Sequence, residues 1–365
     1  MNKINSGIFS DQKFISIALS LAKLAKPSPN PRVGCVIVKN NKIIGKGYHE
    51  KAGFDHAEII AIKSVKDKKK LEGSTLYVTL EPCMHFIGKR TPSCANELLK
   101  YDFARIVIGC LDQNPKVSSI NLLKKKFNVT VLNDASCKQL NESFFHYIKT
   151  TKPFVLLKMA MTLDSKIAKN KGTRTLISNA KSRKLANSWR CEYDAILVGV
   201  NTIIKDNPRL TCLSDQSKNP IRIILDSRLR IPLNAKVFKQ KGTTIIATTK
   251  KTKPDRISQI EKLGVKVVVL PSDRLGYVNL KSLLTYLGKR EITSIMVEGG
   301  SEVASSFVNA GLVNKVAFFI APKVLGKGKD ALDKKAKEKL GNIFHLNSVE
   351  VKEIGKNVLV QGYWH

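Results

Sequence analysis

Four residues in the first third of the chain have the types and spacing for metal-assisted hydrolysis. His56 and Glu58 stand one residue apart, Cys83 follows a proline, and Cys94 comes eleven positions later. One imidazole and two thiolates form a three-ligand zinc set that leaves a fourth position open for water. Zinc lowers the pKa of such a water to about 7. The sequence therefore predicts Zn²⁺ held by His56, Cys83 and Cys94, with Glu58 as the catalytic group that moves protons.

The order His-x-Glu followed by Pro-Cys is typical of zinc nucleobase deaminases, in which hydroxide attacks the ring carbon that bears the exocyclic amine. Each part alone is weak, because a His-Ala-Glu triplet arises by chance and free cysteines are often simply buried. The conjunction of all four residues, in this order, is what makes the pattern specific. It predicts hydrolytic release of ammonia from an amidine-type ring.

A second pattern lies near residue 298. The segment 294–301 reads as a strand that runs into Gly299 and Gly300 and then into a helix. Glycines let a backbone approach an anion, and a helix N-terminus offers free N–H groups and the positive end of its dipole. The pattern suits a dinucleotide phosphate, although an ordinary tight turn has the same residues. It also differs from the Gly-x-Gly-x-x-Gly motif of the Rossmann fold.

Alternating strands and helices must position these residues, and they predict an α/β fold. In the first half we expect helices over 11–26, 57–66, 92–100 and 137–148, and strands over 33–38, 42–47, 75–79, 105–109 and 129–132. The polar, proline-containing stretch 150–153 suggests a boundary, so we expect domains at 1–149 and 150–365. Further strands are expected near 195–199, 221–225, 244–247, 265–269, 294–298 and 316–320.

Composition narrows the class of protein. The 365 residues include 63 Lys+Arg and 29 Asp+Glu, a net charge of +34. The lysines are scattered and Asn and Ile are abundant, which favours genome composition over a nucleic-acid partner as the cause. No apolar run approaches the roughly 18 residues of a membrane span. No export signal is evident, so we expect a cytoplasmic protein, and seven cysteines there argue against a disulfide framework.

Five motifs lie between residues 29 and 94: Pro-Asn-Pro-Arg-Val-Gly-Cys-Val-Ile-Val (29–38), Gly-Lys-Gly-Tyr-His (45–49), His-Ala-Glu (56–58), Leu-Glu-Pro-Cys-Met-His (80–85) and Arg-Thr-Pro-Ser-Cys (90–94). Together they resemble the deaminase domain of the bifunctional riboflavin-biosynthesis deaminase/reductase family. The resemblance implies a three-layer cytidine-deaminase-like domain. Ten residues separate the two cysteines, two more than the family's usual spacing, so we expect the extra residues to bulge and leave the ligands in place.

By the same resemblance, the pyrimidine and its phosphoribosyl arm would be held by a set of polar residues. An arginine suits a phosphate, and an asparagine can read the amide edge of a pyrimidine. The implied substrate-binding residues are Asn30, His49, His85, Arg90 and Asp112.

The second half resembles the reductase domain of that family, through motifs at 158–164, 194–202, 206–211, 224–227, 297–300 and 321–326. The resemblance implies a dihydrofolate-reductase-like fold that binds NADPH and reduces the ribosyl chain. Carried over by position, the cofactor would be lined by Ala160, Thr202, Asp206, Ser227, Gly299 and Gly300. The phosphoribosyl substrate would face Lys158, Arg190, Asn207, Leu210 and Glu298, with Lys158 or Glu298 relaying a proton.

Two positions depart from the family pattern. Leu176 stands where a tryptophan usually lies beside the nicotinamide, and Leu213 stands where an arginine is usual; Arg174 could restore the missing charge at the substrate. The resemblance implies phosphorylated pyrimidine substrates and a homo-oligomer. Two alternatives stay open: a deaminase whose second half has decayed into a binding domain, and a nucleic-acid-editing deaminase.

Overall fold

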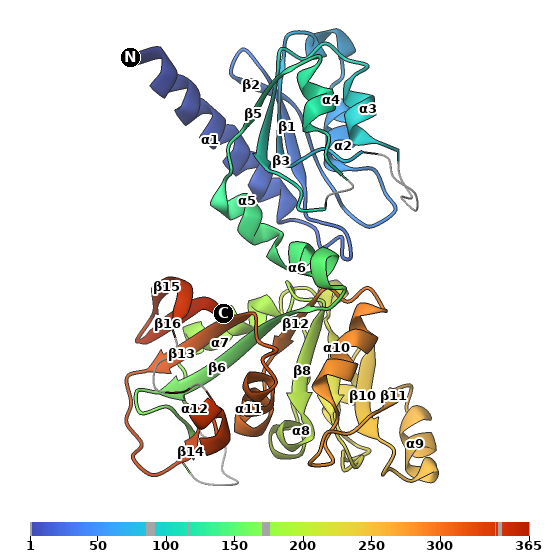
Figure 1. Cartoon of the computed structure of the whole chain (residues 1–365), viewed down its shortest axis with the longest axis vertical. Helices are drawn as coiled ribbons and strands as arrows, with labels where there is room; N and C mark the ends of the chain where they lie inside the picture. Colours follow the sequence, from blue (N-terminus) through green and yellow to red (C-terminus); the bar gives the residue numbers. More distant parts are fainter. Residues whose placement is uncertain are drawn as a thin grey trace. The chain divides into compact units, whose positions relative to one another are not determined.

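The computed structural model describes residues 2–84, 92–114, 117–169, 176–339, 341 and 345–364. The chain divides into two compact units, Met1–Thr151 and Lys152–His365, which are described separately below (Figure 1). Three of the expected site residues, His85, Arg90 and Arg174, lie outside the described residues.

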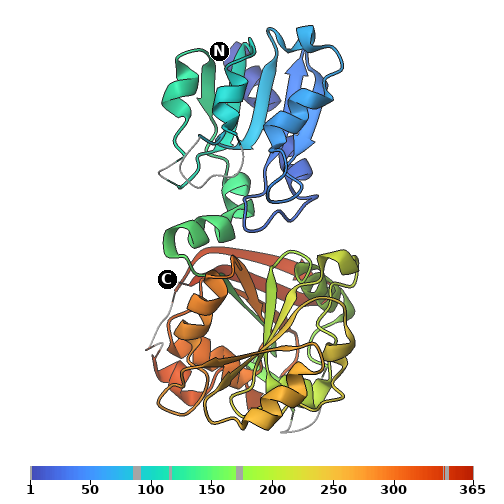
Figure 2. The ribbon, with the colours of Figure 1, turned by 90° about the vertical axis from the view of Figure 1, so that its right-hand side faces the viewer.

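The first unit is a three-layer α/β domain. Among the described residues its strands form one sheet in the order β2-β1-β3-β4-β5, with β1 antiparallel to both neighbours and β3, β4 and β5 parallel. Helices α2, α3 and α4 cover one face, and α1 and α5 cover the other (Figures 1 and 2). The strands are β1 (Gly34–Lys39), β2 (Lys42–Tyr48), β3 (Thr75–Leu80), β4 (Arg105–Cys110) and β5 (Asn128–Val131); the helices are α1 (Asn2–Ala22), α2 (Ala57–Ser64), α3 (Cys94–Leu98), α4 (Ile120–Lys124), α5 (Ala135–Leu140) and α6 (Glu142–Thr150).

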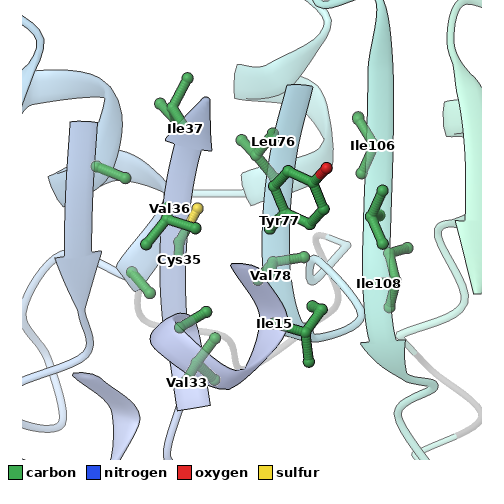
Figure 3. Close-up of a cluster of buried hydrophobic side chains, with 14 of the residues drawn as sticks. Ile15, Val33, Cys35, Val36, Ile37, Leu76, Tyr77, Val78, Ile106 and Ile108 are labelled. Carbon is green, nitrogen blue, oxygen red and sulfur yellow. The ribbon is translucent and has the colours of Figure 1, made fainter. Parts of the chain in front are cut away.

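The core of this unit forms on both faces of the sheet. Ile15 of α1 is buried together with side chains of β1, β3 and β4, among them Val36, Tyr77 and Ile106 (Figure 3). Because helices cover both faces, β1 and β3 consist of nearly continuous apolar residues instead of alternating ones.

Two glycines of β2 let α2 pack directly on the sheet. A Cβ at Gly47 would lie 2.5 Å from the carbonyl oxygen of Ala57, and one at Gly45 would lie 2.6 Å from that of Ala61. Any larger residue at either position would push α2 away. His56 precedes α2 and Glu58 lies in its first turn, so these glycines determine how closely both side chains approach the sheet.

The second unit is built on a larger sheet. Its described strands are ordered β11-β10-β9-β8-β12-β6-β13-β16-β15, parallel from β11 through β13 and antiparallel from β13 to β15. A separate pair joins β14 to β7. The strands are β6 (Phe154–Thr162), β7 (Lys166–Ala168), β8 (Ala195–Gly199), β9 (Ile221–Leu225), β10 (Thr244–Thr249), β11 (Lys266–Leu270), β12 (Ser294–Val297), β13 (Lys315–Ala321), β14 (Lys329–Asp330), β15 (Leu346–Ile354) and β16 (Asn357–Trp364). The helices are α7 (Ala180–Trp189), α8 (Val200–Asp206), α9 (Pro254–Glu261), α10 (Leu280–Gly288), α11 (Ser301–Asn309) and α12 (Lys334–Lys339).

Residues of the parallel strands alternate between two buried clusters. Leu157 and Val297 pack in the cluster that includes α10 and α11, whereas Leu156 and Met296 pack in the cluster that includes α7, α8 and α9. The carboxyl ends of β8, β9 and β12 therefore meet at one edge of a sheet that is covered on both faces. Ligands of open α/β sheets bind at such an edge.

Three expectations from the sequence need correction. The helix expected over 137–148 is two helices, because the Asn141 side chain turns to accept a bond from the Arg32 N–H (2.8 Å) and donate one to the Arg32 carbonyl (3.0 Å). The hairpin of β15 and β16 was not expected. A disulfide joins Cys191 and Cys212, although the sequence argued against such bonds. Within the described part of the chain, no helix combines the length and apolar character needed to cross a membrane.

Candidate active sites

The first unit gathers the three expected zinc ligands at one point. The Nδ1 atom of His56 lies 3.1 Å from the Cys94 sulfur and 3.3 Å from the Cys83 sulfur, and the three ligand atoms all lie within 4.8 Å of one another. Zn–N bonds of about 2.0 Å and Zn–S bonds of about 2.3 Å place tetrahedral ligand atoms roughly 3.6 Å apart. A small outward movement would let one zinc ion contact all three, so the ligand set fits the metal.

Backbone contacts hold the two cysteines together. The Cys83 carbonyl accepts hydrogen bonds from the Ala95 N–H (3.2 Å) and from the Ser93 hydroxyl (3.2 Å). The Ser93 hydroxyl also accepts from the Asn96 N–H and so caps α3, whose first residue is Cys94. The end of β3 and the start of α3 are thus joined directly, whatever the length of chain between them.

Near these ligands, Glu58 is a buried carboxyl group, and one of its oxygens makes no hydrogen bond to the described residues. Its side chain is 3% exposed, and its Oε2 has no hydrogen-bond partner among the described residues. Burial raises the pKa of Glu58, the charge of Cys83 raises it further, and His56 opposes the rise. A buried polar atom without a partner is costly, so Glu58 is suited to meet a water or a substrate proton at this site.

His49 and Asn30 form one hydrogen-bonded unit next to the ligands. His49 Nδ1 lies 3.1 Å from the Asp55 carbonyl, which can only accept, so Nδ1 carries the proton and Nε2 accepts from the Asn30 amide (3.0 Å). Burial lowers the pKa of His49, which favours this neutral tautomer. The His49 ring also meets the His56 ring edge-on at 4.9 Å. One N–H of the Asn30 amide is thereby used, which fixes the orientation of the amide and leaves its oxygen and second N–H to face a substrate.

Glu81 is a positioning residue that the sequence analysis did not single out. Its buried carboxylate accepts bonds from the N–H groups of Ser119 (2.6 Å), Ile120 (3.3 Å) and Asp112 (3.2 Å). The loop that carries Asp112 is therefore tied to the strand end that carries Cys83. The only sequence signal was a carboxylate directly before Pro-Cys.

In the second unit, two cations and a carboxylate meet beside β6 and β12. Arg190 forms two parallel bonds with Glu298, Nε to Oε1 and Nη2 to Oε2, both 2.9 Å. Glu298 follows Val297, which pairs with Leu157, so it is adjacent to Lys158 in the sheet. Burial lowers the pKa of Lys158, and the positive charge of Arg190 lowers it further. The negative charge of Glu298 opposes this shift. Burial alone would raise the pKa of Glu298, but the charges of Arg190 and Lys158 lower it.

Of the expected cofactor residues, Thr202, Ser227, Gly299 and Gly300 follow β8, β9 and β12 in the chain, whereas Ala160 lies within β6. A Cβ at Gly300 would meet nothing within 4 Å, so packing within the protein does not require a glycine there, and the space beside it is open. Thr202 lies half-buried in the first turn of α8, and Asp206 ends that helix exposed. Ser227 follows β9, and its hydroxyl accepts from the Val278 N–H (3.1 Å).

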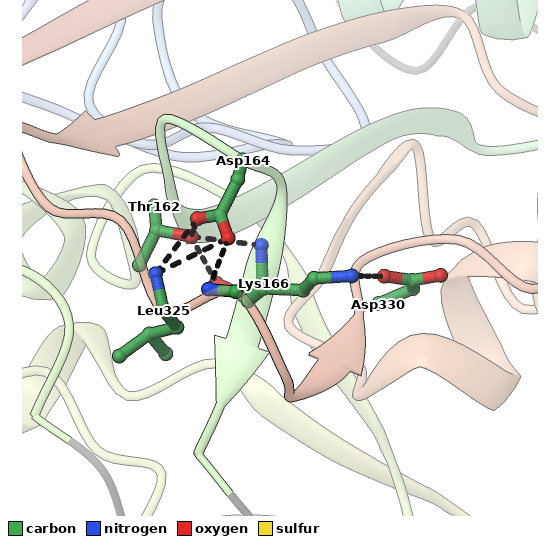
Figure 4. Close-up of polar contacts among 6 residues, drawn as sticks. Thr162, Asp164, Lys166, Leu325 and Asp330 are labelled. Carbon is green, nitrogen blue, oxygen red and sulfur yellow. Dashed lines mark hydrogen bonds and ion pairs between the residues drawn. The ribbon is translucent and has the colours of Figure 1, made fainter.

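A polar network holds the turn after β6 (Figure 4), the strand on which Lys158 and Ala160 lie. The Asp164 carboxylate accepts from the N–H groups of Leu325 (3.1 Å) and Gly326 (2.7 Å), and Lys166 pairs with Asp330. The motif at 321–326 is therefore fixed to this turn.

Leu176 lies next to the same segment. Its carbonyl accepts a bond from the Lys323 ammonium (3.1 Å), and its side chain is 58% exposed. A large apolar side chain exposed to solvent is available to cover a flat ring.

Asn207 and Leu210 lie in the loop after α8, both with positive φ (40° and 56°). The Asn207 side chain accepts from the Lys236 N–H (2.8 Å), and Leu210 is buried, which leaves the main chain as its part that can contact a substrate. The disulfide of Cys191 and Cys212 joins this loop to the residue after Arg190.

Comparison with known families assigns each unit to a class. The family model "Cytidine and deoxycytidylate deaminase zinc-binding region" matches residues 9–110, and the model "RibD C-terminal domain" matches residues 153–360. The expected fold class, a cytidine-deaminase-like domain followed by a reductase domain, is confirmed. A zinc-binding deaminase and a nicotinamide-dependent reductase are thus the classes of the two halves.

Relatives of known family cover nearly the whole chain. The riboflavin biosynthesis protein RibD of Aquifex aeolicus is 42% identical, over 87% of this chain and 88% of that protein; the one from Actinobacillus pleuropneumoniae is 40% identical, over 96% and 94%. A solved structure of Acinetobacter baumannii RibD matches with a TM-score of 0.83 at 30% identity, covering 98% of this chain and 99% of that one. A Thermotoga maritima structure described as a diaminohydroxyphosphoribosylaminopyrimidine deaminase/5-amino-6-(5-phosphoribosylamino)uracil reductase matches with a TM-score of 0.82 at 33% identity, covering 98% and 99%.

The chain belongs to the RibD family of riboflavin biosynthesis proteins. It is a bifunctional enzyme, a hydrolase that deaminates and an oxidoreductase that reduces. The prediction of two activities is confirmed, and the match over both halves favours it over a decayed second half or a nucleic-acid-editing deaminase.

Proposed function

We propose that the first unit deaminates 2,5-diamino-6-(5-phosphoribosylamino)pyrimidin-4(3H)-one to 5-amino-6-(5-phosphoribosylamino)uracil, and that the second unit then reduces the ribosyl chain to a ribityl chain with NADPH. The observation that carries the first step is the buried, partnerless Glu58 oxygen beside the His56, Cys83 and Cys94 ligand atoms. The observation that carries the second is the Lys158, Arg190 and Glu298 cluster at the carboxyl edge of the sheet.

In the deaminase, zinc bound by His56, Cys83 and Cys94 would supply hydroxide at neutral pH by lowering the pKa of a water to about 7. Glu58 accepts a proton at Oε2 and returns it to the leaving amine, so that ammonia departs. Asn30, oriented by His49, presents its amide oxygen to an N–H edge of the pyrimidine. Asp112, held by Glu81, is available to the phosphoribosyl arm.

Replacing Glu58 by Gln tests the deaminase role. The variant keeps the shape and removes the proton acceptor, so we expect ammonia release to fall by about 10²- to 10⁴-fold, the range of general acid–base catalysis. Zinc content, measured by metal analysis, should stay at that of the unchanged protein. A variant that retains zinc and also retains full ammonia release would contradict the assignment.

In the reductase, bound NADPH would supply the hydride that reduces C1 of the opened ribosyl chain. The residues of the chain provide position and the proton. Lys158, with its lowered pKa, can donate a proton to the opening ring oxygen, and Glu298 balances the charge that Lys158 and Arg190 bring into the site. Arg190, fixed to Glu298 by two bonds, keeps its remaining N–H groups available for the anionic substrate.

The choice of NADPH over NADH is supported by charge at the end of β9. Arg228 and Arg230 follow Ser227, both exposed, and Arg230 donates to the Asn201 side chain of α8 (3.0 Å). They bring two guanidinium groups to the carboxyl ends of β8 and β9, where a 2′-phosphate would add negative charge to a dinucleotide.

An Arg230→Ala variant tests this cofactor choice. We expect its KM for NADPH to rise about tenfold or more while its KM for NADH changes little, because only NADPH carries the 2′-phosphate. Arg274→Ala, which removes another exposed arginine of the same unit, is the matched control. Equal changes for the two dinucleotides would contradict the role of Arg230.

We also propose that the chain forms a homo-oligomer. The edge strand β15 exposes Val349 (50%) and Val351 (64%), and exposed apolar edges favour association. Sedimentation at several concentrations tests this; a single monomer species at all of them would contradict it.

A further inference from the structure

The disulfide between Cys191 and Cys212 joins the two segments of the reductase that we assign to the substrate. Cys191 directly follows Arg190, whose guanidinium is fixed to Glu298. Cys212 lies two residues after Leu210, in the loop that begins at Asn207. The bond therefore ties the loop to the arginine that faces the phosphoribosyl substrate.

The remaining contacts of this loop lie near its ends. Asn207 accepts from the Lys236 N–H, and Asn219 accepts from the Cys212 N–H (3.0 Å) while donating to the Lys241 carbonyl (3.2 Å). Among the described residues from 207 to 215, no helix or strand is present. Without the disulfide, the loop would keep only side-chain packing and the contact between the Ser214 hydroxyl and the Cys191 sulfur (3.3 Å) to connect it to the Arg190 side of the site.

The two cysteine residues differ slightly in exposure. Cys191 is 8% exposed and Cys212 is 1% exposed, and the Ser214 hydroxyl lies 3.3 Å from the first sulfur and 3.5 Å from the second. Leu213, between Cys212 and Ser214, is 68% exposed, so the loop lies at the surface. A small reagent would therefore reach the pair after a modest opening of this surface loop.

We propose that this cysteine pair is a reversible redox site that sets the substrate affinity of the reductase. In the disulfide form the loop is held against Arg190, and the phosphoribosyl substrate binds well. In the dithiol form the loop is released, and the substrate binds more weakly. The inference rests on the proposed reductase function and on the assignment of Arg190 and the 207–214 loop to the substrate side.

The chemistry is thiol–disulfide exchange with a low-molecular-weight disulfide. The Cys191 thiolate attacks that disulfide, forming a mixed disulfide and releasing one small thiol; the Cys212 thiolate then displaces the second small thiol and closes the protein bond. The pair loses two electrons and two protons, and the small disulfide gains them as two thiols. Excess small thiol reverses both steps.

The experiment compares the full-length enzyme after treatment with oxidised glutathione or with a phosphine reductant, which avoids chelation of zinc by dithiols. Mass spectrometry of peptides establishes the state of the Cys191–Cys212 pair. The KM for 5-amino-6-(5-phosphoribosylamino)uracil, the KM for NADPH and the rate of ammonia release are then measured. We expect the dithiol form to have a KM for the uracil about three- to tenfold higher, with the other two quantities unchanged.

Cys191→Ser and Cys212→Ser variants provide the matched test. Each should show the high KM for the uracil in both treatments, and Cys137→Ser, which removes a buried free cysteine of the first unit, should still respond to redox state. If a serine variant fails to fold, the comparison of the oxidised and reduced states of the unchanged enzyme tests the proposal by itself. Equal KM values in the two verified states, or a pair that stays reduced in oxidised glutathione, would overturn the proposal. Absence of NADPH oxidation in every state would instead refute the reductase function itself.

Discussion

Three carboxyl groups of this chain have pKa values shifted in different directions, because their surroundings differ. Burial raises the pKa of Glu58 and of Asp112, whereas the charges of Arg190 and Lys158 hold the pKa of Glu298 low despite its burial. A carboxyl group whose pKa is raised holds a proton more readily, which suits the proton transfers of deamination. One that stays ionised suits a site that must hold two cations close together.

The pH dependence of deamination should include Asp112. Burial is the main cause that raises its pKa to about 6, so it becomes protonated as the pH falls through that value instead of near 4. Because protonation removes its charge, we expect kcat/KM for deamination to fall as the pH drops below about 6. Since kcat/KM reports on the free enzyme, a profile from about pH 8 to about pH 5 measures this directly.

Asp112→Asn is the control for that profile. The amide can still accept the bond from the Asn114 N–H (2.8 Å in the unchanged protein) but cannot ionise. Its kcat/KM should be lower and should lack the inflection near pH 6 that belongs to Asp112. An unchanged inflection in this variant would assign the titration to another group.

Glu298→Gln should weaken the reductase alone. The amide can accept only one of the two bonds from Arg190, and it leaves Lys158 and Arg190 without a counter-charge. Hydrogen bonds to charged groups contribute about 1.5–3 kcal/mol, so we expect kcat/KM for NADPH oxidation to fall by about 10- to 100-fold.

The same assay contains its own controls. Ammonia release by Glu298→Gln should match the unchanged protein, because the substitution lies in the second unit. Glu350→Gln, which removes a carboxylate of β15 that pairs with Lys352, should leave NADPH oxidation unchanged. A reductase that is unaffected by Glu298→Gln would show that the Arg190 pair is structural.

Among the elements, helix α2 shows how sequence sets a catalytic position. It packs on β2 only because Gly45 and Gly47 lack side chains, and its start carries both a zinc ligand and the proton carrier. The glycines thus affect the chemistry by setting a distance. A shift of the helix would move His56 and Glu58 relative to Cys83, in the loop after β3, and Cys94, the first residue of α3.

Gly47→Ala should destabilise the first unit. The new Cβ would lie 2.5 Å from both the Ala57 carbonyl oxygen and the Ala61 nitrogen, which are backbone atoms that cannot move alone. Overpacking of this kind costs about 1–3 kcal/mol, so the midpoint of urea unfolding followed by loss of ammonia release should drop. Lys46→Ala, at an exposed position of the same strand, should unfold like the unchanged protein. Equal midpoints for Gly47→Ala and Lys46→Ala would contradict this packing account.

Sequence reasoning reached the elements that have a local pattern and missed those that depend on distant partners. Strands such as 105–109 were evident from apolar runs, and His56, Glu58, Cys83 and Cys94 from their order. The break at Asn141 could not be anticipated, because it depends on Arg32, far away in the chain. Glu81 and the Cys191–Cys212 bond were missed for the same reason: their partners adjoin them only in the fold.

For the molecule as a whole, the net charge of +34 is not needed to explain either site. The groups proposed to hold phosphate are individual residues such as Arg190 and Arg230, whereas the lysines are spread over the chain. The two activities instead belong to two separate folds, each with its own core. The central claim is therefore that one chain performs two steps in a fixed order.

The most direct test follows ammonia release and NADPH oxidation together, with zinc-loaded protein, the diaminopyrimidinone phosphate and NADPH. The account predicts ammonia first, then NADPH oxidation after a lag. It also predicts that Glu58→Gln shows neither signal until 5-amino-6-(5-phosphoribosylamino)uracil is supplied, when NADPH oxidation returns to the normal rate. NADPH oxidation by Glu58→Gln on the diaminopyrimidinone alone would contradict the order, and none on the supplied uracil would contradict the second activity.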